Sequence, residues 1–113
     1  MNIEWMRRYC MSLPHATETL QWEALVFKIG GKIFAIAALE PNKTWLSFKV
    51  TPEDFDELVE REGIIQAPYF ARHQWVALET EDALSAAELK RSVRKSYDLV
   101  VEKLPKKTRA ALL

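Results

Sequence analysis

The pattern of apolar residues predicts three helices. Asn2 can cap a first helix that runs to about Leu13, because apolar residues recur there at helical spacing and Pro14 cannot continue the helix. The apolar stripe of this helix consists of Ile3, Met6, Cys10 and Leu13. We interpret Cys10 as a small buried hydrophobe rather than a nucleophile, since no basic partner is placed beside it.

The second predicted helix begins after Thr51, which is a suitable cap with Pro52 at the first helical position. Its apolar stripe consists of Phe55, Leu58 and Val59, and Gly63 is expected to end it. The helix is strongly acidic. We interpret its carboxylates as a solvated face and not as a metal site, because a hard cation needs about six oxygen ligands that converge from several elements.

The third helix is the longest. Ser85 and Glu88 have the spacing of a capping box, and the apolar stripe continues to about Leu104 before Pro105 stops the helix. The last residues, 106–113, are expected to form a short terminal turn or to fray.

Between residues 20 and 50 the apolar period falls to two, which predicts a meander of strands. Gly30-Gly31 is expected to form a two-residue hairpin turn, because glycine readily takes the positive φ angles that such turns need. The predicted cross-strand pairs are Ile29 with Lys32, Phe27 with Phe34, and Leu25 with Ile36. This register places Leu25, Phe27, Phe34 and Ile36 on one face and Val26, Lys28, Ile33, Ala35 and Ala37 on the other.

Two further strands follow the same alternation. Residues 44–50 turn Leu46, Phe48 and Val50 inward, and residues 74–79 turn Val76 and Leu78 inward. Their outward positions then include Trp45, Lys49 and Trp75. The order helix, strands, helix, strand, helix predicts an α+β fold of two layers, an antiparallel sheet with helices packed on one face. Residues 1–113 should form a single domain.

Composition narrows the functional classes. The chain has 16 basic and 16 acidic residues, so no global electrostatic field steers it toward a polyanion. A single cysteine excludes an intramolecular disulfide, and no apolar run is long enough to span a membrane. We therefore expect a cytoplasmic, monomeric protein that does not associate with membranes.

Catalytic signatures are missing from the sequence. There is no glycine-rich phosphate loop, and neither His15 nor His73 has a second histidine or cysteine at the spacing of metal ligands. The serines lack the context of a nucleophile elbow. We therefore expect no enzymatic activity, no cofactor and no metal site.

Charge is distributed unevenly along the chain. Residues 88–113 contain eight basic and three acidic residues, a local net charge of +5. The basic residues are Lys90, Arg91, Arg94, Lys95, Lys103, Lys106, Lys107 and Arg109. They form either a solvated helix face or a surface that contacts phosphates.

The outward face of the sheet is a second candidate surface. Trp45 and Trp75 together with Lys28 and Lys49 would combine stacking platforms with positive charges, as proteins that bind single strands do. Alternatively, the C-terminal tail or the loop 64–70 covers both tryptophans.

Residues 62–78 are interpreted first as a connector between a helix and a strand. This segment also contains Tyr69, Arg72, His73 and Trp75, which could line a small-ligand pocket against the sheet. Tyr69 and the two tryptophans Trp45 and Trp75 could instead anchor a protein partner.

Three segments carry a resemblance to a known family. They are GGKIFAIAAL (30–39), LSFKVTPEDFDELVEREGIIQAPYFARHQWVAL (46–78) and SYDLVVEKLPKKTR (96–109), and in this order the chain resembles the MmcQ/YjbR family of small bacterial proteins. The resemblance implies a fold similar to bacterial frataxin (CyaY-like). It also implies DNA binding, which in this family is attributed to a pair of wing-like elements; Lys32, Lys43 and Arg72 occupy such places here. The iron binding of frataxins is not carried over, because the first helix has Glu4 against Arg7 and Arg8.

The sequence therefore favours a small DNA-binding protein of low sequence specificity. A protein-interaction module with an aromatic sheet face and a small-ligand-binding protein are the alternatives.

Overall fold

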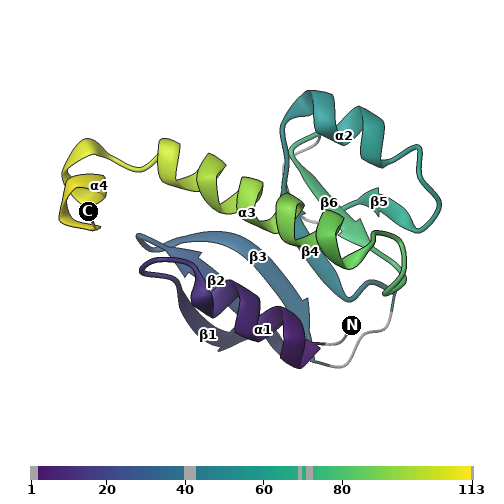
Figure 1. The fold of residues 1–113 in the computed structure, drawn as a ribbon, viewed down its shortest axis with the longest axis horizontal. Helices are drawn as coiled ribbons and strands as arrows, with labels where there is room; N and C mark the ends of the chain where they lie inside the picture. Colours follow the sequence, from purple (N-terminus) through teal and green to yellow (C-terminus); the bar gives the residue numbers. More distant parts are fainter. Residues whose placement is uncertain (1–2, 40–42, 69, 71–72, 113) are drawn as a thin grey trace.

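The computed structural model describes residues 3–39, 43–68, 70 and 73–112. Its helices and strands are α1 (Ile3–Ser12), β1 (Thr17–Gln21), β2 (Ala24–Ile29), β3 (Lys32–Ala38), β4 (Leu46–Lys49), α2 (Pro52–Leu58), β5 (Ile64–Gln66), β6 (Trp75–Leu78), α3 (Ala86–Glu102) and α4 (Lys106–Leu112) (Figure 1). The sheet has the order β1-β2-β3-β4-β6-β5, and every neighbouring pair of strands is antiparallel.

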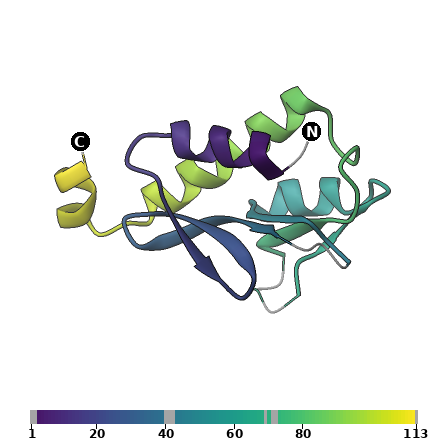
Figure 2. The ribbon, with the colours of Figure 1, turned by 90° about the horizontal axis from the view of Figure 1, so that it is seen from below.

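Helices α1, α2 and α3 pack on one face of this sheet (Figure 2). The other face, which carries none of these helices and which Phe70 covers in part, is called the open face. The main core lies between the two layers. It joins Met6 and Cys10 of α1, Phe55 of α2 and Leu89 of α3 to the inward side chains of the strands. The predicted two-layer α+β fold is therefore confirmed.

The helix caps follow the sequence closely. The Asp54 backbone N–H donates to Thr51 Oγ1 at 3.1 Å, and Ser85 and Glu88 form both hydrogen bonds of a capping box. Helix α2 ends at Leu58, earlier than Gly63, and a turn then leads into β5. The final segment forms the helix α4, not a single turn or a frayed end.

The predicted register of β2 and β3 is correct at the turn and wrong beyond it. Ile29 pairs with Lys32, but Phe27 pairs with Ala35 and not with Phe34. Phe34 is an extra residue in β3, a bulge that shifts all later pairs by one residue. Phe34, Ala35 and Ala37 all join the main core, and Ile36 faces the open side of the sheet.

Two strands were absent from the prediction. β1 begins at Thr17, where the sequence TETLQ is mostly polar, and β5 is a three-residue strand within the segment interpreted as a connector. Both lie at sheet edges. Edge strands pair on one side only, and little of their surface is buried, so they leave a weak apolar signal.

Trp45 is also placed differently from the prediction. It precedes the first residue of β4, so the alternation of that strand does not apply to it. Its side chain is 6% exposed in the main core, and its Nε1–H donates to the Thr80 carbonyl oxygen at 2.9 Å. The inward positions Leu46, Phe48 and Val50 are confirmed.

Candidate nucleic-acid interface

The hairpin turn of β2 and β3 packs against the start of α4 at one end of the molecule (Figure 1). Gly30 has a φ of 59°, and a Cβ built on it would lie 2.8 Å from Leu104 Cδ1 and 3.2 Å from Thr108 Cγ2. The turn therefore needs glycine for its backbone angle and also for the close approach of Leu104. This contact brings the hairpin turn, which Lys32 directly follows, beside Leu104, just after α3, and the first turn of α4.

Basic side chains gather at this end from three parts of the chain. We call this surface the basic end and define it by Lys32, Lys49, Lys103, Lys106, Lys107 and Arg109. Lys32, Lys103, Lys106 and Lys107 are exposed. Partial burial lowers the pKa of Lys49, and repulsion from Lys103 lowers it further. Among the residues that the structure describes, no member of the basic end forms an ion pair.

The basic flank of α3 is different, because three of its four cations have partners within the molecule; the fourth, Arg91, forms no ion pair with the described residues. Lys95 Nζ lies 2.6 Å from Asp54 Oδ2, and Arg94 Nε lies 3.2 Å from Asp98 Oδ1. Lys90 Nζ lies over the Trp5 ring at 5.4 Å. These contacts offset part of the charge that the sequence placed on this helix.

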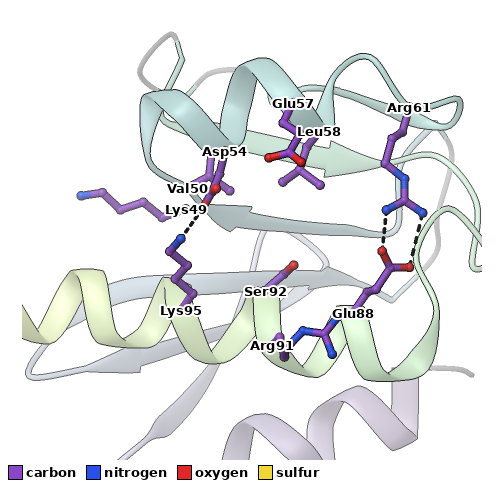
Figure 3. A pocket seen from close by; sticks show the side chains of 10 residues that line it. All are labelled: Lys49, Val50, Asp54, Glu57, Leu58, Arg61, Glu88, Arg91, Ser92 and Lys95. Carbon is purple, nitrogen blue, oxygen red and sulfur yellow. Dashed lines mark hydrogen bonds and ion pairs between the residues drawn. The ribbon is translucent and has the colours of Figure 1, made fainter.

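A polar cleft of about 360 Å³ separates α2 from α3 (Figure 3). Two ion pairs cross it, Lys95 with Asp54 at one end and Arg61 with Glu88 at the other. The hydrogen bond from Arg61, reinforced by the backbone N–H of Ser85, lowers the pKa of Glu88 to about 2. The same pairing raises the pKa of Arg61. The two ion pairs hold the walls of the cleft together. Because these walls carry both signs of charge, the cleft presents no concentrated charge to a ligand.

Neither predicted stacking tryptophan is exposed. Trp75 does face the open side of the sheet, but it is 8% exposed because Phe70 stacks on it with 4.4 Å between the ring centroids. The alternative that the loop 64–70 covers this residue is therefore confirmed for Trp75. Trp45 lies in the main core. Neither tryptophan is therefore exposed to form the aromatic anchor that the sequence predicted for a protein partner.

Trp22, which the sequence did not single out, is the exposed tryptophan among the described residues, with 71% of its surface accessible. It forms the two-residue turn between β1 and β2 with Glu23, and both residues have positive φ angles, 53° and 57°. Such turns favour Asn and Gly, so this one carries local strain. No glycine, proline or asparagine signals a turn here, which is why the sequence did not reveal it.

Trp22 forms part of a largely apolar groove of about 650 Å³ on the open face of the sheet. We call it the open-face groove; its lining residues are Trp22, Ala24, Ile36, Thr44, Ser47, Pro68 and Phe70. Lys43 is exposed and directly precedes Thr44. Lys28 follows Ala24 by four residues along β2 and so projects from the same face of the strand.

The two described residues of the predicted small-ligand pocket, His73 and Trp75, lie against different neighbours. His73 lies against Phe55 of α2 with 4.8 Å between ring centroids, whereas Trp75 lies beneath Phe70 on the open face. Tyr69 and Arg72 are outside the described residues. Burial raises the pKa of the Cys10 thiol to about 12, which agrees with its interpretation as a buried hydrophobe.

The described part of the chain has neither a cluster of metal ligands nor a helix that could cross a membrane. No group of three or more His, Cys, Asp and Glu side chains is placed to hold a metal ion. No helix in these residues has the length and apolar character that crossing a membrane requires.

Comparisons with known proteins agree on one family. The model of the YjbR family matches residues 11–99. The chain is 24% identical to "Uncharacterized protein YjbR" of Escherichia coli K12, over all of this chain and 98% of that protein.

Two crystal structures are similar to the fold. One is protein DR2400 of Deinococcus radiodurans, with the domain DUF419, which has a TM-score of 0.82 and 29% identity over 98% of this chain and 87% of that one. The other is a Pseudomonas syringae protein with a TM-score of 0.75 and 21% identity over 88% and 98% of the two chains. The expected likeness to bacterial frataxin stays a prediction. Because the family model matches residues 11–99, which are most of this chain, the chain belongs to the YjbR family.

Proposed function

We propose that this protein binds DNA with low sequence specificity and without enzymatic activity, and that the basic end makes the phosphate contacts. The observation that carries the proposal is the cluster of cations without ion-pair partners among the described residues. Ammonium groups that are free of internal partners can neutralise phosphates and release the counterions condensed on DNA.

The lowered pKa of Lys49 supports the same surface. Repulsion between Lys49 and Lys103 disfavours two positive charges in one place, and a bound phosphate would relieve it. Glu102 is the acidic residue nearest in sequence, at the end of α3. The positive charge of this end is local, since the whole chain carries no net charge.

The low specificity follows from the kind of side chain available. Lysine is a flexible point charge, and contacts to phosphates position a protein on DNA without reading its sequence. Lysines predominate in the basic end, where Arg109 is the single arginine.

The affinity for a labelled duplex, measured at several salt concentrations, tests the proposal. The logarithm of the binding constant should fall linearly with the logarithm of salt, with a slope of about −0.9 for each phosphate contacted. The double variant Lys106→Gln with Lys107→Gln should bind more weakly and have a slope shallower by about 0.9 for each lysine that contacts a phosphate.

The matched control removes two cations outside the basic end, Arg8 of α1 and Arg94 of α3. Arg8→Gln with Arg94→Gln changes the net charge equally and should leave the slope nearly unchanged. If the control weakens binding as much as the lysine variant, the basic end is not the site. Absence of binding tighter than about 100 μM at low salt would remove DNA as the partner.

A further inference from the structure

We propose that the open-face groove receives a base of single-stranded nucleic acid, with Trp22 as the stacking surface. This inference rests on the proposed function, and adds the form of nucleic acid that the protein prefers. In a duplex the faces of the bases are stacked on one another, whereas an unpaired base presents a face on which an aromatic ring can stack.

The accessibility of Trp22 is the first observation. The residue has 71% of its surface exposed, although burying a tryptophan side chain is favourable. The backbone of Trp22 and Glu23 also adopts a conformation that non-glycine residues rarely take. A strained turn that displays a large ring toward an apolar groove points to a ligand with an aromatic face.

Phe70, the other aromatic residue that lines the groove, is held in place by packing. Phe70 stacks on the buried Trp75 at 4.4 Å with an angle of 21° between the ring planes, so its position depends on the sheet below. The floor is formed by Ala24, Ile36 and Ser47. Small and branched side chains at the floor, with aromatic side chains at the walls, suit a flat ring of the size of a nucleobase.

Charge complementarity selects a nucleotide over an uncharged aromatic ligand. Lys43 directly precedes Thr44, which lines the groove. Lys28 lies on the same face of β2 as the groove residue Ala24, four residues further along the strand; at about 3.3 Å per residue the two are about 13 Å apart. Both side chains belong to the face of the sheet that carries the groove or adjoin it, so they are available to neutralise backbone phosphates of a strand that crosses this face. Glu23 is the carboxylate next to Trp22, and it is exposed to solvent.

The test compares three labelled probes of equal length: an oligothymidine, the same backbone with abasic sites, and a duplex. Wild-type protein should bind the oligothymidine more tightly than the abasic strand. Trp22→Asn removes the ring and keeps a residue that tolerates positive φ, so the fold should persist. It should weaken oligothymidine binding by about fivefold or more, the loss expected for one stacked base, and leave the other two probes unchanged.

Leu20→Ala is the matched control, because Leu20 is similarly exposed at 68% and does not line the groove. It should affect none of the three probes. If Trp22→Asn leaves oligothymidine binding unchanged while Lys106→Gln with Lys107→Gln weakens it, this inference fails and the proposed function stands. If no probe binds, both fail. A dimer in sedimentation that Trp22→Asn dissociates, with binding unchanged, would make the groove an interface between copies and also overturn the inference.

Discussion

The hydroxyl group of Ser96 donates a hydrogen bond to the carbonyl oxygen of Phe34 at 2.6 Å. The same oxygen atom of Ser96 accepts a hydrogen bond from the Lys49 backbone N–H at 2.9 Å, and the residue is completely buried. The pairing of β3 with β4 ends at Ala35 and Phe48, one residue before these two groups. A side chain of α3 therefore satisfies one backbone group of β3 and one of β4 just beyond the last residue pair of these two strands.

Ser96→Ala should destabilise the protein through this bridge. The change leaves a buried carbonyl oxygen and a backbone N–H without their partner, which lowers the free energy of unfolding by about 1–3 kcal/mol for each group left unsatisfied. Urea unfolding followed by circular dichroism measures the loss. Ser92→Ala, one turn earlier on α3, is the control and should change stability little, because Ser92 is half-exposed in the cleft between α2 and α3. Equal losses would show that the bridge contributes nothing.

Gly30→Ala should destabilise the protein more than Gly31→Ala. Both glycines have positive φ, so each substitution carries a backbone cost of about 1–2 kcal/mol. Only at Gly30 does the added methyl group also meet Leu104, a buried residue, whereas the space around Gly31 is open within 4 Å. Thermal unfolding of the two variants measures the difference. Identical melting temperatures would mean that the turn does not pack on Leu104 in solution.

Replacing the turn Trp22-Glu23 by Asn-Gly should stabilise the protein. Asn and Gly suit the positive φ angles of this turn, and relief of the strain should raise the free energy of unfolding by about 1 kcal/mol. Urea unfolding provides the measurement. Gln21→Gly, a control inside the extended strand β1, should instead lower stability, because glycine weakens a strand. A loss of stability in the Asn-Gly variant would contradict the inference that the backbone of Trp22 and Glu23 is strained.

The pairing of Glu88 with Arg61 should be visible in an acid titration. The folded-state pKa of Glu88 is about 2, below the ordinary value of about 4.3 that it has in the unfolded chain. A lowered folded pKa contributes stability that is fully present above the unfolded value and is lost as pH falls through about 2.

NMR of the Glu88 carboxyl carbon should show a midpoint near pH 2 in the wild type. In Arg61→Gln the midpoint should move upward, because the main cause of the lowered pKa is removed, and remain below the ordinary value, because the Ser85 backbone N–H still donates. Arg94→Gln, which breaks a different ion pair, should not move it. An unchanged midpoint in Arg61→Gln would exclude the pair as the cause.

Elements with local signals could be predicted from the sequence. The caps at Thr51 and Ser85, the hairpin turn at Gly30 and Gly31, and the inward face of β4 depend on residues a few positions apart. Their hydrogen bonds and periodicity are encoded within one element, so the residues themselves specify them. The two-layer arrangement followed from the order of these elements.

The features that decide the candidate site arise from contacts between distant parts of the chain. The backbone of Phe34 is satisfied by Ser96, 62 residues away, and the burial of Trp75 depends on the ring of Phe70. Sequence alone determined which residues of α3 and α4 are basic. The tertiary structure decided which of those cations are paired and which stand free beside the hairpin, because ion pairs such as Lys95 with Asp54 form only when two elements pack together.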